Sequence, residues 1–296
     1  MKIKKLLCAA LAAMAVLSTV SAFAATEDPV QFSTVDEMNG QVYVAPFSDT
    51  WQDLYFKGGN IKLNLIPQIM LKYIYPYFCS YNDRFYYMDG DSEITKIYSC
   101  DRNGNNDFLI ADKVLGKESV YIVDNTLYYT AYSSKWDYDN KYSRQYYGGI
   151  YKVNLITGEW QRVVTDDNAI MSYCDGDYIY YSVENSYYQI DTNGNYCHYA
   201  SQYTDEFRYC MTDSYRQVGD DYIGWYSYRL MGNKGYYIDE NNRLYCKWRN
   251  TNEKTFLSTL EKGYDLSIQR ITKNYIYYSV QWWDDPFVWL YRIDRY

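Results

Sequence analysis

The feature that most constrains this chain is a two-part repeat. In its clearest copy, residues 177–182 read Asp-Tyr-Ile-Tyr-Tyr-Ser and residues 188–194 read Tyr-Gln-Ile-Asp-Thr-Asn-Gly. Aromatic and β-branched residues favour strands, and Asn-Gly favours a tight turn. The second aromatic residue of the first part serves as an anchor. Strong copies of the anchor are Tyr87, Tyr129, Tyr181 and Tyr278, and weaker copies are Val44 and Trp225.

Successive anchors are separated by 43, 42, 52, 44 and 53 residues. Each is followed by a closing tyrosine that stands three residues before an Asp, Asn or Gly. These tyrosines are Tyr55, Tyr98, Tyr151, Tyr188, Tyr236 and Tyr291. A strand-rich repeat of about 40–50 residues is typical of a propeller with one blade per repeat. The sequence therefore predicts an all-β fold, a six-bladed β-propeller of four-stranded blades, with a β-sandwich as the alternative.

The repeat resembles that of the YWTD-type six-bladed propellers of low-density-lipoprotein-receptor-related proteins. Here Tyr180-Tyr181-Ser182 and Tyr277-Tyr278-Ser279 take the place of the Tyr-Trp-Thr core of that motif. Val183 and Val280 stand where the motif has Asp, so the chain is more similar to bacterial secreted relatives, a domain group without an assigned function. The resemblance covers residues 40–296 and implies the fold, but it implies no activity.

The first 24 residues have the pattern of a secretory signal peptide. A basic start with Lys2, Lys4 and Lys5 precedes an apolar stretch over residues 6–20, and Ala22-Phe23-Ala24 offers a small-residue cleavage site. No later apolar stretch is long enough to cross a bilayer. We expect a mature chain that starts near Ala25. We also expect residues 25–39 to form an N-terminal segment and residues 40–296 a single propeller domain.

Charge excludes some partners. Without the three signal-peptide lysines, 26 basic and 37 acidic residues remain, a net charge of −11. Nucleic acids and anionic membranes attract basic surfaces. We therefore expect neither nucleic-acid binding nor membrane insertion, but a monomer secreted to the cell envelope or outside the cell.

Tyrosine is the most unusual component, with 41 residues. A tyrosine ring can be buried while its hydroxyl keeps a hydrogen bond, so most of these residues need no role beyond packing the strands. Six cysteines follow the signal peptide: Cys79, Cys100, Cys174, Cys197, Cys210 and Cys246. An even number in a secreted chain permits disulfides in any of 15 pairings, and buried free thiols are the alternative.

The ring must close, because an open sheet leaves an unpaired edge. The last repeat ends without an outer strand, so residues 30–35 are expected either to complete the last blade or to start the first. Loops between the second and third strands of each blade should share one face of the disc. We assign residues 47–51, 131–149, 226–233 and 282–287 to this loop class.

Aromatic and acidic residues in these loops are the candidate binding residues. Exposed aromatic rings can stack on sugars or hold peptide side chains, and carboxylates can accept hydrogen bonds from hydroxyl groups. An alternative is that the rings cap the ends of the blades. The candidates are Trp51, Trp136, Asp137, Tyr138, Trp282, Trp283, Asp284 and Asp285.

Signs of catalysis are weak. The single histidine, His198, falls on an expected outer strand, where a Ser-His-Asp or Cys-His site would rarely form. Residues 101–112 share a few positions with a calcium loop, but their glycine is at the fourth position and the twelfth residue is Asp, so a hairpin turn explains them better. Loop acids such as Asp284 with Asp285, or Asp137 with Asp139, could serve a glycosidase.

The sequence thus predicts a non-enzymatic binding module at the bacterial cell envelope, without a cofactor or metal. Its partner would be an extracellular protein, peptide or glycan held on the face of the loops between second and third strands. Two alternatives stay open: a carbohydrate-active or other hydrolase that uses loop carboxylates, and a structural component of the envelope.

Overall fold

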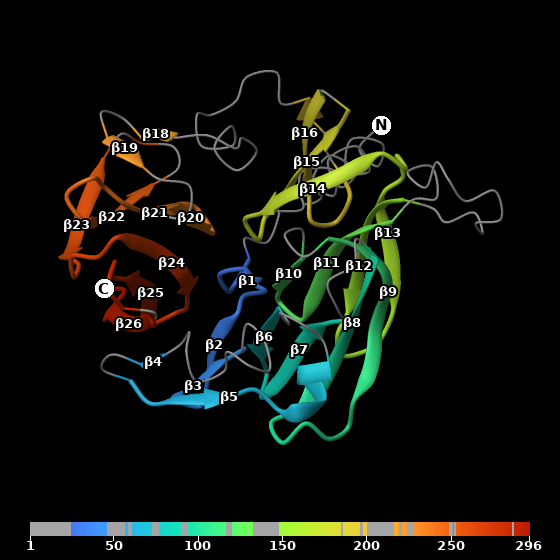
Figure 1. Ribbon diagram of the computed structural model, residues 1–296. Helices are drawn as coiled ribbons and strands as arrows, with labels where there is room; N and C mark the ends of the chain where they lie inside the picture. Colours follow the sequence, from blue (N-terminus) through green and yellow to red (C-terminus); the bar gives the residue numbers. More distant parts are fainter. Residues whose placement is uncertain are drawn as a thin grey trace, which may run out of the picture.

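The computed structural model describes residues 25–45, 57–58, 61–72, 77–89, 94–116, 120–132, 148–184, 186–195, 198–199, 216–218, 221–223, 228–248, 251, 253–285 and 287–296. Regular structure in these residues is almost entirely strand, with a short 3-10 helix, η1 (Gln68–Lys72). Sheets of two to nine strands, mostly antiparallel, surround a common centre, and β1 (Val30–Gln31) lies near that centre (Figure 1). Mostly antiparallel sheets arranged around a centre are typical of a β-propeller, so the fold is β-propeller-like.

The largest sheet has nine strands, which are two four-stranded antiparallel series and β1. The first comprises β6 (Phe78–Tyr81), β7 (Arg84–Met88), β8 (Ile94–Asp101) and β9 (Phe108–Leu115). The second comprises β10 (Val120–Val123), β11 (Thr126–Ala131), β12 (Gly149–Asn154) and β13 (Trp160–Val164). They are joined where β9 and β11 meet, at Val114 and Ala131.

Two further sheets each have four antiparallel strands. One comprises β14 (Ala169–Cys174), β15 (Tyr178–Val183), β16 (Ser186–Asp191) and β17 (His198–Tyr199). The other comprises β20 (Tyr228–Met231), β21 (Lys234–Ile238), β22 (Arg243–Trp248) and β23 (Lys254–Thr259). A separate hairpin consists of β18 (Arg216–Val218) and β19 (Asp221–Ile223).

The remaining two sheets each contain a parallel strand. In one, β24 (Asp265–Ile271), β25 (Tyr275–Gln281) and β26 (Val288–Asp294) are antiparallel, and β4 (Lys57–Gly58) pairs parallel with β26. In the other, β2 (Val35–Met38) and β3 (Gln41–Val44) are antiparallel, and β5 (Leu63–Leu65) pairs parallel with β3. The outer strand beside β26 therefore comes from the region after β3.

Residues 30–35 divide between two places. Val35 begins β2, the first strand of the sheet that β2 forms with β3, which corresponds to the expectation that residues 30–35 start the first blade. Val30 and Gln31 instead pair with Ile122 and Tyr121 on the inner strand β10, a position that the sequence did not indicate. Hydrophobic alternation predicts a strand here, but it cannot say which edge that strand joins.

The tyrosine repeat forms a series of stacked pairs. In each pair, one tyrosine of the second strand lies directly opposite one tyrosine of the third strand, with ring centroids 5.3–5.8 Å apart and planes inclined by 19–22°. Such cross-strand aromatic pairs stabilise antiparallel sheets. The pairs are Tyr87–Tyr98, Tyr129–Tyr151, Tyr181–Tyr188, Tyr237–Tyr245 and Tyr278–Tyr291. In four of these pairs the two tyrosines are an anchor and a closing residue of the sequence repeat, whereas Tyr237 and Tyr245 were assigned to neither role.

The fifth repeat differs from its prediction. Tyr236, expected to be the closing tyrosine, lies on the second strand β21 next to the true anchor, Tyr237, while Trp225 lies outside the described residues. The turn at residues 239–242 connects β21 to β22, so it is not the turn that follows a third strand. Consequently residues 228–231 of the expected loop 226–233 form the inner strand β20.

Buried side chains cluster between neighbouring sheets. Met231 and Leu244 pack with Ile268 and Ile276 between the β20–β23 and β24–β26 sheets. The last sheet also contacts the first, where Tyr277 and Leu290 pack with strands β2 and β3. The core is thus distributed around the centre and not held between two layers, so the β-sandwich alternative does not apply.

Candidate functional site

Half of the predicted binding residues lie in one described turn, between β25 and β26. The Trp283 side chain is 77% exposed, and its ring centroid lies 3.6 Å from that of Tyr264, which is 57% exposed. Asp284 is exposed. Together Trp283, Tyr264 and Asp284 form an aromatic and acidic surface, called here the aromatic turn.

Trp282 and Asp285, in the same turn, have structural roles. Trp282 is partly buried against the core and meets the Trp289 ring edge-on at 6.4 Å. One oxygen of Asp285 accepts a hydrogen bond from the Trp289 indole at 2.7 Å, and the other accepts one from the Phe287 amide at 2.9 Å. The two tryptophans therefore divide between the two expected roles, since Trp282 packs and Trp283 faces solvent. Trp51, Trp136, Asp137 and Tyr138 lie outside the described residues.

A groove that the sequence did not indicate lies between the β20–β23 sheet and the end of β26. Its volume is about 600 Å³, and Trp248, Phe256 and Tyr296 line it with exposed rings. The Lys234 ammonium lies 4.7 Å from the Trp248 ring centroid and 4.9 Å from that of Tyr296. Its lining includes Lys234 and Trp248, beside the β20–β21 turn, and extends along β23 as far as Ser258. In the sequence, the residue that could have indicated this groove is Trp248, a tryptophan at the end of a strand.

The centre of the fold is held by the N-terminal segment, residues 25–34, and by the start of β2. Hydrogen bonds connect this segment to most of the surrounding sheets, as the following pairs show. They are Ala25–Asp177, Thr26–Asp124, Asp28–Arg295, Gln31–Leu230, Ser33–Phe78 and Ser33–Gln269.

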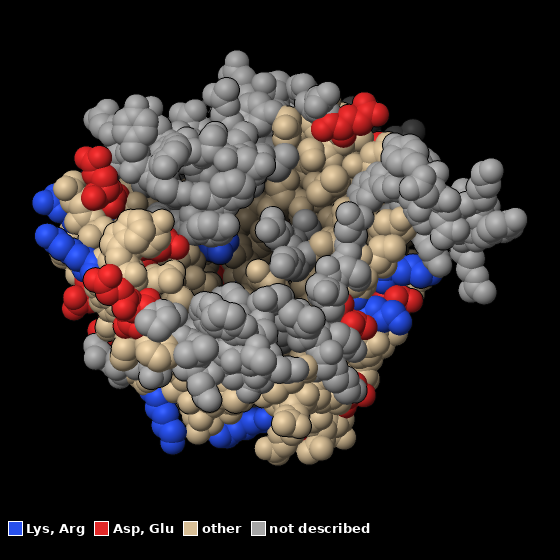
Figure 2. Space-filling model, in the orientation of Figure 1, with Lys and Arg blue, Asp and Glu red and all other residues tan. Residues whose placement is uncertain are grey.

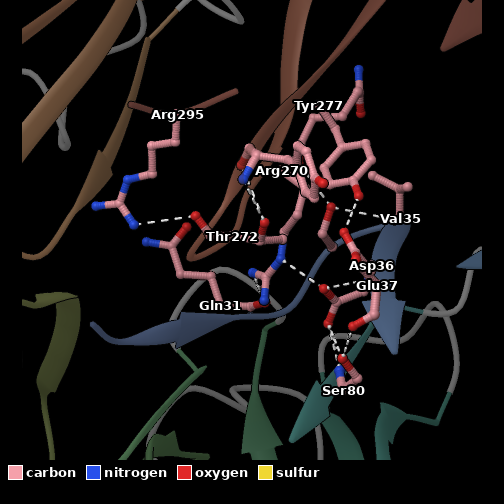
Figure 3. A network of polar contacts seen from close by, with 12 residues as sticks. Gln31, Val35, Asp36, Glu37, Ser80, Arg270, Thr272, Tyr277 and Arg295 are labelled. Carbon is pink, nitrogen blue, oxygen red and sulfur yellow. Dashed lines mark hydrogen bonds and ion pairs between the residues drawn. The ribbon is translucent and has the colours of Figure 1, made fainter. Parts of the chain in front are cut away.

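A buried ionic network continues from this segment into β2 (Figure 3). Asp36 and Arg270 are 2% and 6% exposed, and their carboxylate and guanidinium groups are 3.4 Å apart. The Ser80 amide and hydroxyl donate to the other oxygen of Asp36, at 2.5 and 3.1 Å, and Arg270 also donates to the backbone carbonyl of Gln31. Buried charges require such partners. This cluster therefore has the properties of a structural network.

Tyr277 extends the network by donating a hydrogen bond to Glu37. Burial, and to a smaller extent the Glu37 carboxylate, raise the pKa of the Tyr277 hydroxyl above its usual value. The hydroxyl therefore stays protonated and keeps its donor role at neutral pH. Neither Asp36 nor Glu37 was a sequence candidate, because nothing in a single short strand marks its acids as members of a polar network.

Acidic residues at the hairpins hold the turns. The carboxylates of Asp101, Asp191 and Asp239 each accept backbone hydrogen bonds from the residues two and four positions later. The bond from Asn105 contributes most to lowering the pKa of Asp101 below its usual value. The hairpin interpretation of residues 101–107 is confirmed.

The structure also places the single histidine and four of the cysteines. His198 lies on β17, an outer strand of its sheet, as predicted. The described cysteines, Cys79, Cys100, Cys174 and Cys246, are free thiols. Burial raises the pKa of all four, to about 12 for Cys100. Cys79, Cys100 and Cys174 are buried, and buried thiols with raised pKa values are poor nucleophiles, so these three positions have a packing role, whereas Cys246 is half-buried.

Charge on the visible face is mixed. Blue and red side chains both lie around the rim of the described surface in Figure 2. In the described part of the chain, no helix is both long and apolar enough to span a membrane.

Comparisons with known proteins give low similarities. No protein-family model and no curated protein matches the sequence. Among solved structures, TolB from Acinetobacter baumannii is 14% identical, with a TM-score of 0.35 over 72% of this chain and 51% of that one. A nidogen/laminin complex is 10% identical, with a TM-score of 0.31 over 58% of this chain and 57% of that one.

An oligogalacturonate lyase from Vibrio parahaemolyticus is 12% identical, with a TM-score of 0.32 over 72% of this chain and 62% of that one. The chain thus spans about half to three fifths of the length of these three structures. They include both an enzyme and a complex between proteins, and at these TM-scores they carry no argument about function.

Proposed function

We propose that this protein is a secreted, non-enzymatic binding module at the cell envelope, built as a six-bladed β-propeller of four-stranded blades. In this proposal the ligand is a glycan, held on the face of the loops between second and third strands. The proposal retains the sequence-based similarity to secreted bacterial relatives of the YWTD-type propellers.

The observation that carries the proposal is the exposure of the aromatic turn. Trp283 and Tyr264 place two large rings in solvent although buried packing was available to their neighbour Trp282. Exposed aromatic groups of this size are typical of interaction sites. A ring face can stack on the C–H groups of a sugar, and the exposed Asp284 carboxylate can accept hydrogen bonds from its hydroxyls.

The state of the neighbouring acid supports binding over hydrolysis. A glycosidase needs two carboxyl groups that are free to move protons or attack the sugar. Both oxygens of Asp285 are engaged by Trp289 and Phe287, which leaves Asp284 without a free acidic partner in this turn.

The test is an array of immobilised glycans and peptides probed with the purified protein and two variants. We expect glycan binding by the native protein, loss of binding in Trp283→Ala, and retention in Trp160→Ala. Trp160 is the matched control because it is 70% exposed on β13, in a different sheet.

Other outcomes separate the alternatives. Selective binding of peptides would replace the glycan by a peptide ligand. Release of cleaved sugar products during incubation would support the hydrolase. Loss of glycan binding in Trp248→Ala, with retention in Trp283→Ala, would move the site to the groove beside Trp248.

A further inference from the structure

The amide of Ala25 occupies a fitted position beside a carboxylate. Its nitrogen lies 2.7 Å from Oδ1 of Asp177, which belongs to the turn between β14 and β15. The side chain of Ala25 lies against Gly176, where an added Cβ would come within 2.6 Å of it. This glycine also has a φ of +102°, so the turn favours glycine for two independent reasons.

The next residue is held in the same way. The amide and the hydroxyl of Thr26 both donate to the Asp124 carboxylate, at 3.0 and 2.7 Å. Asp124 belongs to the turn between β10 and β11, so Ala25 and Thr26 connect two adjacent sheets. The Ala25 nitrogen is thus held by its own hydrogen bond to Asp177 and by the hydrogen bonds of the next residue, Thr26.

The sequence places the expected cleavage site directly before this nitrogen. Hydrolysis after Ala22-Phe23-Ala24 breaks the bond between the Ala24 carbonyl carbon and the Ala25 nitrogen. Water supplies a hydroxyl group to Ala24 and a proton to Ala25. The amide of Ala25 then becomes an α-amino group, with an ordinary pKa of about 8, so it is mainly charged at neutral pH.

We propose that processing after Ala24 creates an ion pair between the new α-ammonium group of Ala25 and the Asp177 carboxylate, which secures the N-terminal segment in the centre of the mature protein. The inference rests on the proposed secretion.

The charge changes the strength of this contact. Before cleavage, a neutral amide donates to the carboxylate, whereas afterwards a full positive charge faces a full negative one in a partly buried site. The same segment carries Gln31 and leads into Asp36, both of which contact Arg270 on β24. Tightening its first residue therefore strengthens connections among the sheets around the centre.

The experiment uses the full precursor, secreted from a bacterial host, beside a precursor with one glycine inserted between Ala24 and Ala25. Cleavage after Ala24 then leaves Ala25 as an amide in the second product, with the ammonium group one residue away. Each form is made with native Asp177 and with Asp177→Asn. Asp101→Asn is the control, because Asp101 holds a turn elsewhere.

We expect mass spectrometry to show a mature chain that begins at Ala25. The glycine-extended product should melt about 2–4 °C lower. This difference in melting temperature between the two products should shrink in high salt. It should disappear in Asp177→Asn but persist in Asp101→Asn. An equal difference with and without Asp177, in products that are correctly cleaved, would overturn the ion pair while leaving the proposed secretion intact. An uncleaved or differently cleaved chain would overturn both.

Discussion

Asp36 and Arg270 form a buried ion pair although 234 residues separate them in the chain. Asp36 lies on β2 in the first sheet and Arg270 lies on β24 in the last, so the pair joins the two ends of the described fold (Figure 3). Asp36 also accepts a hydrogen bond from Ser80, and Arg270 also donates one to Gln31. These bonds satisfy the two charges inside the protein.

Removing one charge from this pair should be costly. We expect Asp36→Ala or Arg270→Ala to lower the free energy of unfolding by about 3–5 kcal/mol, because the remaining charge would be buried without its partner. Chemical denaturation provides the measurement. The matched control is Asp167→Ala, which breaks the more exposed pair with Arg162 and should cost about 0–1 kcal/mol. Equal losses at the two sites would contradict the buried network.

The corrected fifth repeat can be tested by truncating its anchor. Tyr237 is fully buried, so we expect Tyr237→Ala to lower the free energy of unfolding by about 3–5 kcal/mol, as truncation of large buried aromatic residues does. The exposed Tyr264→Ala should stay within about 0.5 kcal/mol of the native protein. A similarly small effect at Tyr237 would mean that the Tyr237–Tyr245 stack does not hold its sheet.

Ionisation of the Cys100 thiol should lower the free energy of unfolding at high pH. Its pKa is raised to about 12 by burial, whereas an unfolded cysteine titrates near 8.5. The folded protein thus retains a proton that the unfolded chain releases. This contribution to stability is complete below about pH 8.5 and is lost as pH rises toward 12, by about 1.4 kcal/mol per pH unit.

Comparing the native protein with Cys100→Ala over this pH range measures the contribution, because the alanine variant lacks this thiol. The free energy of unfolding of the native protein should fall more steeply with pH. Parallel curves would show that the Cys100 thiol titrates alike in the folded and unfolded states.

The aromatic turn should contribute to binding without contributing to stability. We expect Trp283→Ala to weaken ligand binding by about 2 kcal/mol or more, roughly 30-fold, as loss of a central aromatic contact does. Its melting temperature should stay near that of the native protein, because the ring is largely in solvent. Calorimetric titration and thermal melting test both parts, and a large loss of stability with unchanged affinity would assign Trp283 to packing.

The sequence by itself determined the strand-rich repeat and identified the tyrosines of four of the five stacked pairs. Period-two alternation and turn residues act locally, so Tyr181 and Tyr188 can be assigned to two consecutive strands from the sequence, and the structure then places them opposite each other. The same local chemistry explains why Asp101 was correctly assigned to a turn. It also marked Trp282 and Trp283 as belonging to one turn, without showing that one is packed and the other exposed.

Only the tertiary structure decided which distant residues meet. The ion pair of Asp36 with Arg270, the pairing of Val30 with Ile122 and the contact of Ala25 with Asp177 all join segments that are at least 92 residues apart. No local pattern encodes such contacts, because they depend on how whole sheets are arranged around the centre. The groove beside Trp248 arises for the same reason, since its walls come from two sheets whose separation is set by the side chains packed between them.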